Sequence, residues 1–429
     1  MKISKLIKDS SFAVYGLGLT GTSVLKFLKK KKIKNIYMWD DKNKKNNKKK
    51  INLFRKKLNE VDYIVISPGI NIRKTKFKST LFKNKKKIIT DLDVFYMQKI
   101  PIKSIVITGT NGKSTACKLT QHIFKTNQLD AQLGGNFGKP ILDLKIKRKS
   151  IVIIEASSFQ LSYTKFVKPT FAAILNISND HLDWHNTIAN YKNSKFKIFS
   201  KQDANDVALL KNKKLINTFV KQNYLSKLKI IKKNIPNNAI KRKITNNYLT
   251  SEPNLENLAF AHQISKLFKI KEKIFIKAVN NFKGLPHRYE IFLKKKKITF
   301  INDSKATSFQ ATKYALKNNK NIFWIFGGLP KIRDNFNLVG VSSNIIKSFI
   351  IGKRTNYFKN QVEKKIKYKI SSNLKNAIKD VFKELISVKE SNATVLLSPA
   401  SASYDQFNNF AERGNQFKKI IKNYAKKFL

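Results

Sequence analysis

Residues 104–115, SIVITGTNGKST, indicate the fold and the first chemistry of this 429-residue chain. A short β-branched run is followed by a glycine-containing loop and then by a segment of helical character. In such a loop the glycines let backbone N–H groups converge on phosphate oxygens, and the helix N-terminus adds a positive dipole. Lys113 supplies charge, and Ser114 or Thr115 can reach magnesium. The loop is two residues shorter than a standard P-loop, but we predict that it binds a nucleoside triphosphate through Gly109, Thr110, Asn111, Gly112, Lys113, Ser114 and Thr115.

The same unit, a short apolar run followed by a polar loop and a helical segment, recurs along the chain. The runs are FAVY 12–15, YIVI 63–66, IVII 151–154, FAAIL 171–175, ITFI 298–301, NIFWIF 321–326, FII 349–351 and TVLL 394–397. Strands that alternate with helices predict an α/β protein with mostly parallel sheets. Ligands of such sheets bind beyond the carboxyl ends of the strands. The polar loops are therefore where function should lie.

A second glycine motif, GLGLTG at 16–21, follows FAVY and precedes a strand, IYMW, that ends at Asp40. The pattern is typical of a Rossmann-like turn whose helix N-terminus faces a diphosphate, with the acid at the spacing expected for a ribose hydroxyl. The diphosphate can belong to a dinucleotide or to a UDP-sugar. SPG at 67–69 is a further polar loop after a strand.

Carboxylate and imidazole groups follow two strands of the middle part. EASSFQL begins at Glu155, and NISNDHLDWH at 176–185 contains His181. At strand ends beside a P-loop, Glu155 and His181 are candidate magnesium ligands. The alternative for His181 is a turn cap, which the neighbouring Asn179, Asp180 and Asp183 make less favourable.

The last third of the chain adds four polar loops: HRYE 287–290, NDSKATS 302–308, GGLPKIRD 327–334 and SPASASYDQFNNFAERGNQF 398–417. Arg288 can hold phosphate or carboxylate, or form a surface ion pair with Glu290. Asn254 and Asn257, spaced i and i+3, can bond a base edge or form a polar helix face. By their spacing, Phe407 and Phe410 fit a core better than a ligand contact.

The composition is strongly basic, with 88 Lys and Arg against 26 Asp and Glu and a net charge of +62. This charge suggests nucleic acid or an anionic membrane. Only eight of the 88 are arginine, however, and the lysines are spread over the chain together with many Asn, Ile and Phe residues. Such a bias is also typical of an AT-rich genome, so we expect no specific nucleic-acid partner.

Several protein classes are disfavoured by the sequence. Cys117 is the single cysteine, so an intrachain disulfide is impossible, and we expect this thiol to pack in a helix. The sequence contains no run of 18 uncharged apolar residues, so it predicts no membrane span. Residues 12–28 make a poor secretion signal. We expect a cytoplasmic protein.

The motifs GTNGKST, EASSFQL, NDHLDWH, HRYE and NDSKATS, in this order, resemble those of the Mur ligases. GLGLTG, GGLPK and above all LLSPASASYDQFNNFAERGNQF are most similar to the members that add D-glutamate. The resemblance covers essentially the full chain. It implies a UDP-substrate-binding Rossmann-like domain (1–92), a central P-loop ATPase domain (93–285) and a Rossmann-like, amino-acid-binding C-terminal domain (286–429).

The resemblance also implies the reaction: ATP-dependent addition of D-glutamate to UDP-N-acetylmuramoyl-L-alanine through an acyl phosphate, in peptidoglycan precursor synthesis. It assigns roles to residues of this sequence. Lys113, Glu155, His181 and Lys195 are catalytic. Two Mg²⁺ ions are held by Ser114 or Thr115 with Glu155, and by His181 with a carbamylated Lys195. UDP-substrate contacts come from Leu19, Thr20, Asp40, Ser67, Gly69 and Asn136. Asn254, Asn257, Arg288, Asp303 and Lys305 bind ATP, and Thr307, Lys331, Ser398 and Phe407 receive D-glutamate. A monomer is expected.

The chain departs from the family pattern at two places. Pro253 stands where a His usually precedes the first of the two Asn residues, and the GGLPKIRD loop has Ile-Arg where a Gly is common. These departures affect the adenine pocket and the loop. The alternatives to this function are another Mur-type or folylpolyglutamate-synthase-like ligase, a nucleic-acid-binding NTPase suggested by +62, and an NAD-dependent enzyme suggested by GLGLTG.

Overall fold

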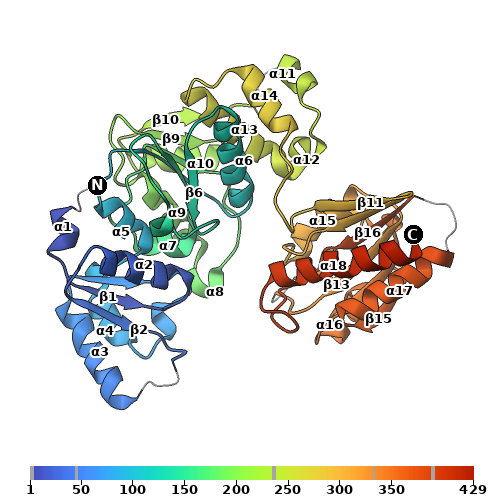
Figure 1. The fold of residues 1–429 in the computed structure, drawn as a ribbon, viewed down its shortest axis with the longest axis horizontal. Coiled ribbons are helices and arrows are strands. Elements are labelled where there is room, and N and C mark those ends of the chain that lie inside the picture. Colours follow the sequence, from blue (N-terminus) through green and yellow to red (C-terminus); the bar gives the residue numbers. More distant parts are fainter. Residues whose placement is uncertain (1–3, 44–46, 234–237, 332–333, 388–391) are drawn as a thin grey trace. The chain divides into compact units, whose positions relative to one another are not determined.

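Three β-sheets organise the chain in the computed structural model, which describes residues 4–43, 47–233, 238–331, 334–387 and 392–429 (Figure 1). Two compact units are distinguished, Met1–Phe282 and Lys283–Leu429. The first unit contains two of the sheets and the second contains one. The α/β class with three sheets is therefore confirmed, whereas the domain boundaries near residues 92 and 285 stay predictions.

The N-terminal sheet is parallel, in the order β2-β1-β3-β4. Its strands are β1 (Phe12–Tyr15), β2 (Ile36–Trp39), β3 (Tyr63–Ile66) and β4 (Ile88–Ile89). Its helices are α1 (Lys5–Lys8), α2 (Leu19–Lys30), α3 (Lys48–Glu60) and α4 (Lys78–Lys83), with the 3-10 turns η1 (Ile72–Lys74) and η2 (Lys85–Lys87). All four residues of β1 are buried, as expected of a parallel strand covered on both faces.

The central sheet is also parallel, in the order β10-β9-β8-β5-β7-β6. Its strands are β5 (Lys103–Thr108), β6 (Ala131–Gly135), β7 (Ile151–Glu155), β8 (Phe171–Ile174), β9 (Val207–Leu210) and β10 (Lys227–Ile230). Its helices are α5 (Asp91–Met97), α6 (Lys113–Thr126), α7 (Ser158–Tyr163), α8 (Leu182–His185), α9 (Ile188–Phe196), α10 (Lys213–Lys221), α11 (Asn238–Lys243), α12 (Asn247–Thr250), α13 (Glu252–Leu267) and α14 (Glu272–Asn280). The shorter 3-10 turns are η3 (Ile141–Asp143) and η4 (Lys197–Phe199). β5, which leads into the P-loop, lies between β8 and β7 in the interior of the sheet.

The C-terminal sheet is mixed, in the order β11-β12-β16-β13-β14-β15. Its strands are β11 (Glu290–Lys295), β12 (Ile298–Asn302), β13 (Ile322–Gly327), β14 (Ile345–Ile351), β15 (Tyr368–Ser372) and β16 (Ala393–Leu397). The helices are α15 (Phe309–Lys317), α16 (Thr355–Val362), α17 (Leu374–Ser387) and α18 (Phe410–Phe428), with the 3-10 turn η5 (Ser342–Asn344). β11 and β12 form a hairpin at the edge of the sheet, and a short lysine-rich turn joins them. Among the described strand pairs of this sheet, it is the only antiparallel one.

Each sheet buries apolar side chains on both of its faces. In the central sheet, Ile105 and Ile107 of β5 face the α6 and α13 side, whereas Val106 faces the side that contains Leu92 and Phe199. Cys117 is fully buried in the first of these clusters, and burial raises the pKa of its thiol, so the prediction of a packing role is confirmed. Within the described residues, none of the helices is long and apolar enough to cross a membrane.

Candidate functional site

The P-loop joins the carboxyl end of β5 to α6, as the sequence predicts. Gly112 caps α6 with a φ of 82°, a conformation that favours glycine. A Cβ atom on Gly112 would also lie 2.2 Å from Oδ1 of Asn257, so the site has no room for a side chain. Ser114 and Thr115 are buried in the first turn of the helix. The backbone N–H groups of this turn form an anion-binding helix N-terminus.

Lys113 folds back over its own loop. Its Nζ donates to the carbonyl oxygens of Gly109 and Thr110, both at 2.8 Å. A phosphate at the helix N-terminus would therefore compete with these two carbonyls for the ammonium group.

Lys195, on α9, reaches the same loop from the opposite side. Its side chain is 1% exposed, and Nζ donates to the Gly109 carbonyl at 2.9 Å and lies 4.5 Å from the centre of the Tyr191 ring. Burial lowers the pKa of Lys195 well below its ordinary value, and the ammonium of Lys113 lowers it further. Asp180 and Glu155 raise it, but burial is the largest effect. The neutral amine is thus favoured far more than in an ordinary lysine.

Glu155 ends β7, the neighbour of β5 in the sheet. Its Oε1 accepts from Nδ2 of Asn136 at 2.7 Å, and the backbone N–H of Asn136 donates to the Glu155 carbonyl at 2.8 Å. Oε2 is buried and has no hydrogen-bond partner. A buried carboxylate oxygen without a donor is costly, and it is a suitable ligand for a hard cation.

His181 stands at the start of α8 with a φ of 54°. Its ring is exposed, lies against Phe159 and Tyr191, and has Nε2 3.6 Å from a carboxylate oxygen of Asp180. Among the described residues, His, Cys, Asp and Glu side chains form no group of three that could hold a metal ion. A two-metal site would therefore need ligands of other kinds, such as hydroxyls, phosphate oxygens or a modified lysine.

Asn254 and Asn257 lie on one face of α13, as their spacing predicts, and both are buried. Nδ2 of Asn257 donates to Oδ1 of Asn254 at 3.0 Å, and Asn254 donates to the Tyr248 carbonyl at the same distance. Pro253 is in the first turn of the helix, where its missing N–H is tolerated. The two hydrogen-bonded amides of Asn254 and Asn257 thus lie beside Gly112 of the P-loop.

Two further residues at this edge were missed in the sequence. The backbone carbonyl and the side-chain Oδ1 of Asn176 accept from the N–H groups of Thr110 and Asn111, each at 2.9 Å. The hydroxyl of Tyr191 is 3.0 Å from Oγ1 of Thr110. Asn176 was within a quoted motif, NISNDHLDWH, but its contact with the loop depends on the β5–β8 pairing and has no local signal.

The N-terminal glycine turn has the predicted Rossmann-like geometry. A Cβ on Gly21 would lie 1.8 Å from the Gly16 carbonyl oxygen, so the third glycine lets helix and strand pack closely. Ser67 donates to the same carbonyl at 2.7 Å. The Asp40 carboxylate accepts from the N–H of Leu17 at 2.5 Å and therefore braces the turn itself. Thr20 is half-buried beside the 86%-exposed Leu19, and Gly69 is exposed.

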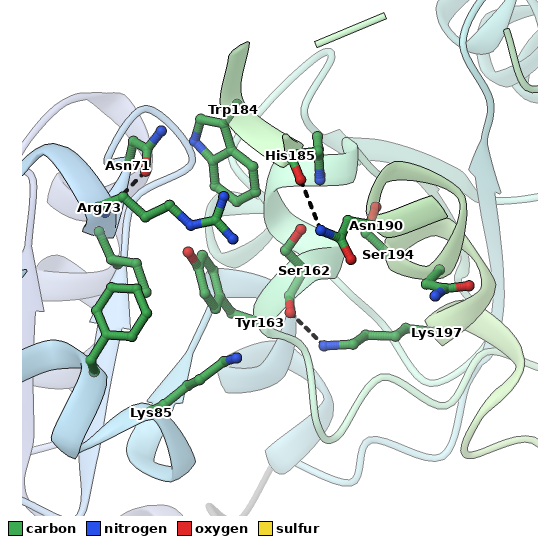
Figure 2. Close-up of a pocket in the computed structure, with 13 residues that line it drawn as sticks. Asn71, Arg73, Lys85, Ser162, Tyr163, Trp184, His185, Asn190, Ser194 and Lys197 are labelled. Carbon is green, nitrogen blue, oxygen red and sulfur yellow. Dashed lines mark hydrogen bonds between the residues drawn. The ribbon is translucent and has the colours of Figure 1, made fainter. Parts of the chain in front are cut away.

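A pocket of about 240 Å³ lies between the N-terminal and central sheets (Figure 2). It begins at Asn71, two residues after Gly69, and its charged lining side chains are Arg73, Lys85 and Lys197. Trp184 and Tyr163 supply aromatic surface, and Nε1 of Trp184 is buried without a hydrogen-bond partner. This cationic and aromatic lining suits an anionic ligand, and none of its residues was singled out as a site residue from the sequence.

In the C-terminal unit, Asp303 is buried at the end of β12. Its carboxylate accepts from the hydroxyl of Ser398 at 2.7 Å and from the N–H of Tyr289 at 2.9 Å. Burial raises the pKa of Asp303 to about 7, although these bonds and the charge of Arg288 oppose the rise. The Nε of Arg288 is buried without a partner, and Glu290 pairs instead with Lys418 at 2.9 Å, so the alternative of an Arg288–Glu290 ion pair is not observed.

The other predicted residues of this unit differ in accessibility. Ser398 is fully buried in its bond to Asp303, whereas Lys331 is exposed and Thr307 is half-buried. Phe407 packs against the apolar cluster under α17 and α18, as its spacing predicts. Lys305 lies 4.6 Å above the Phe410 ring. Ile332 and Arg333, the departure in the GGLPKIRD loop, lie outside the described residues.

Arg413 was also missed in the sequence. It is 1% exposed on α18, and its Nη2 donates to the carbonyls of Ser304 and Ser401 at 2.9 and 3.0 Å, while Nε donates to the Ser304 hydroxyl at 3.0 Å. One guanidinium thus ties together the loops after β12 and β16. Arg413 belongs to the motif SPASASYDQFNNFAERGNQF, but the motif alone does not indicate that its side chain is buried.

The chain matches two protein-family models. Residues 10–89 match "Mur ligase MurD-like, N-terminal domain", and residues 107–275 match "Mur ligase middle domain". Solved structures with a similar fold include MurF ligase from Thermotoga maritima in complex with ADP (TM-score 0.56, 12% identity, covering 99% of this chain and 100% of that one) and UDP-N-acetylmuramate-alanine ligase MurC from the same organism (TM-score 0.55, 13% identity, covering 96% and 99%).

Curated relatives match along the whole chain. The UDP-N-acetylmuramoylalanine–D-glutamate ligase of Rickettsia prowazekii (strain Madrid E) is 31% identical over 97% of this chain and 99% of its own length. That of Wolbachia sp. subsp. Brugia malayi (strain TRS) is 32% identical over 100% and 99%. Together with the three sheets and the P-loop at the end of β5, these full-length matches show that the chain belongs to the Mur ligase family.

Proposed function

We propose that this chain is an ATP-dependent ligase that joins D-glutamate to UDP-N-acetylmuramoyl-L-alanine in the synthesis of peptidoglycan precursors. One observation carries the proposal. The P-loop and Glu155 end two neighbouring strands, and the carboxylate keeps one buried oxygen without a partner. Full-length relatives bearing the name of this ligase support the choice of substrates.

The reaction must activate a poor electrophile. An oxygen of the L-alanyl carboxylate attacks the γ-phosphorus of ATP, the bond to the β-phosphate oxygen breaks, and ADP leaves. The amine of D-glutamate then attacks the acyl carbon, phosphate leaves, and the nitrogen loses a proton. The role of the protein is to position these groups and to offset their charge. In our proposal, Lys113 and the N–H groups at the start of α6 perform this role.

The residues present fit a magnesium ion. Oε2 of Glu155 offers a free carboxylate oxygen, and Ser114 and Thr115 offer hydroxyls one strand away. Magnesium prefers a few such oxygens together with substrate phosphates. When bound, Mg²⁺ offsets the negative charge that accumulates as one anion approaches another. In our assignment, His181 would be a ligand of the second magnesium ion.

Carbamylation of Lys195 would supply the missing acidic ligand. The buried amine, with its strongly lowered pKa, is a nucleophile for carbon dioxide: its nitrogen bonds to the carbon of CO₂ and releases a proton, which leaves a carbamate anion. The change places a carboxylate-like anion beside the ammonium of Lys113. We therefore propose that the active form is the carbamate.

We assign the UDP-substrate to the N-terminal turn and the adjoining pocket. Leu19 is 86% exposed at the turn, where an apolar side chain in water is available for a ligand, and Thr20, Asp40, Ser67 and Gly69 lie around the same sheet edge. The cationic pocket that begins at Asn71 suits a substrate with a diphosphate and a carboxylate. Asn136, already bonded to Glu155, would contact the muramoyl arm.

The remaining assignments follow the family resemblance. Asn254, Asn257, Arg288, Asp303 and Lys305 would bind ATP, and Thr307, Lys331, Ser398 and Phe407 would receive D-glutamate. For Ser398 the role would require its bond to Asp303 to be exchanged, and for Phe407 it would use a ring that is partly in the core. The enzyme would act as a monomer and without nucleic acid.

Phosphate release in the presence of ATP and Mg²⁺ tests the proposal. It should require both UDP-N-acetylmuramoyl-L-alanine and an amino acid, and D-glutamate should be much better than L-glutamate, L-lysine or L-alanine. Release that ignores the UDP-substrate, or that prefers another amino acid, would exclude this ligase reaction.

A further inference from the structure

Asn176 joins the P-loop to the helix that carries Asn254 and Asn257. Its carbonyl and its Oδ1 accept the N–H groups of Thr110 and Asn111 at 2.9 Å each. Its Nδ2 donates to Oε2 of Glu256 on α13, and more weakly to the Asn111 carbonyl at 3.4 Å. The side-chain amide therefore bridges the phosphate loop and α13.

Glu256 fixes the direction of this amide. A carboxylate accepts hydrogen bonds only, so it selects the orientation in which the NH₂ of Asn176 faces α13 and the oxygen faces Asn111. The reversed amide would place two oxygens together and leave the Asn111 N–H facing a donor. A charge-assisted bond of this kind is stronger than a neutral one.

The same helix touches the loop at a second point. Oδ1 of Asn257 lies so close to Gly112 that it excludes a Cβ there. Asn257 and Asn254 are hydrogen-bonded to each other one turn along the helix face. Loop residues 110–112 therefore meet α13 at two points, through the Asn176–Glu256 hydrogen bond at Asn111 and through the close approach of Asn257 to Gly112.

Glu256 keeps this position at a cost. It is half-buried, and desolvation raises its pKa, while the Asn176 bond and Lys211 lower it. A carboxylate near a phosphate site also adds repulsion to the approach of ATP. If Glu256 served only solubility or helix formation, it would not need this half-buried position. Glu252, which is exposed in the first turn of α13, already suits such a role.

We propose that Asn176 and Glu256 are a positioning pair for ATP, which couples the helix assigned to the nucleotide base to the loop assigned to its phosphates. The inference rests on the proposed use of ATP, and it assigns a role to two residues to which the family resemblance assigned none. Neither side chain touches the reacting atoms. Both act through the backbone of Thr110 and Asn111.

Four variants test the pair: Asn176→Ala, Glu256→Ala, Glu256→Gln and the double alanine variant. Each alanine substitution should raise the KM for ATP about tenfold and leave kcat within about threefold, because binding geometry is lost and the chemical groups remain. Glu256→Gln retains an oxygen acceptor and should stay close to the wild type. The double variant should be no worse than Asn176→Ala, since the two residues act as one unit.

Glu252→Ala on the same helix is the matched control, and it should behave as the wild type. Equilibrium binding of a fluorescent ATP analogue should weaken in parallel with the KM, and it needs no ligase turnover, so loss of the proposed reaction and loss of the pair are separate results. An unchanged ATP affinity in Glu256→Ala would overturn the inference. So would an equal rise in the KM for all three substrates, or strictly additive effects in the double variant.

Discussion

Lys113 and Lys195 donate to one and the same acceptor, the carbonyl oxygen of Gly109, at 2.8 and 2.9 Å. Two lysines from different helices thus meet at a single backbone atom. Burial lowers the pKa of Lys195 well below its usual value, and the ammonium of Lys113 lowers it further.

Replacement of Lys113 should abolish ligation. Lys113→Ala removes the side-chain charge that our proposal gives to the β- and γ-phosphates, and we expect kcat to fall about 100- to 1000-fold, as for other lost electrostatic groups. Phosphate release with both substrates present measures this. Lys118→Ala, one turn further along α6, is the control and should retain activity; near-normal turnover of Lys113→Ala would remove the P-loop from the mechanism.

Lys195→Ala should be inactive and chemically rescuable. The variant lacks the amine that would carry the carbamate, but the vacated volume beside Tyr191 and Gly109 can admit a small acid. Added formate or acetate should restore part of the activity, whereas chloride at the same ionic strength should not. A fully active variant, or one indifferent to every acid, argues against the carbamate.

Asp303 should make stability depend on pH. Burial raises its folded pKa to about 7, above the unfolded value near 3.8, so the folded state binds the proton more tightly. Its contribution is therefore complete below the unfolded pKa and is lost as the pH rises toward 7, with a limiting slope of roughly 1.4 kcal/mol per pH unit.

Asp303→Asn should remove that slope. We expect the variant to become more stable relative to the wild type as the pH rises from about 5 to about 7.5. The difference in the free energy of unfolding should then level off above this range. Denaturant unfolding of the full chain at several pH values provides the comparison, and other buried acids such as Asp91 cancel in the difference. A constant difference across this range would contradict an elevated pKa.

Arg413 should be more important for stability than a surface arginine. Arg413→Ala leaves the Ser304 and Ser401 carbonyls without a donor, and each unsatisfied buried group costs about 1–3 kcal/mol. Arg413→Lys can restore one bond at most and should be intermediate. Arg354→Ala, at the start of α16, is the control for loss of an arginine; equal melting temperatures for the Arg413 and Arg354 variants would refute this view.

The sequence predicts the strand, P-loop and helix of the central sheet well because these signals are local. Strand, glycine loop and helix follow one another within the P-loop, and the runs FAVY, YIVI and IVII coincide with β1, β3 and most of β7. Fully buried parallel strands are continuous apolar runs, so they are recognisable without any partner. The α/β class follows from their alternation with helices, whereas the division into three domains was implied by the family resemblance.

Two of the strands that were missed carry no such run. β6 reads AQLGG and β10 reads KLKI, and both are edge strands that need little apolar surface. β9 (VALL) and α10 (KKLINTFVK) were also missed, although the first is a short apolar run and the second has apolar residues on one helix face.

Residues that act across the fold could not be identified from spacing. Asn176 reaches Asn111 through strand pairing, and Arg413 reaches Ser304 over more than a hundred residues. Each of the two lies inside a recognised motif, so the motifs marked the right segments of the chain. Which side chain in a loop is buried, and which carbonyl it meets, is decided by tertiary contacts alone.

β10 shows one benefit of the lysine-rich composition. Among the described strands it is the outermost one of the central sheet, and such an edge can pair with the edge of another molecule. Lys227 and Lys229 alternate with apolar residues along the strand. A second copy that approached this edge in register would therefore bring ammonium groups close to one another. We therefore expect these two lysines to disfavour fibre-like self-association, and a version with valine at both positions should precipitate at concentrations that the natural sequence tolerates.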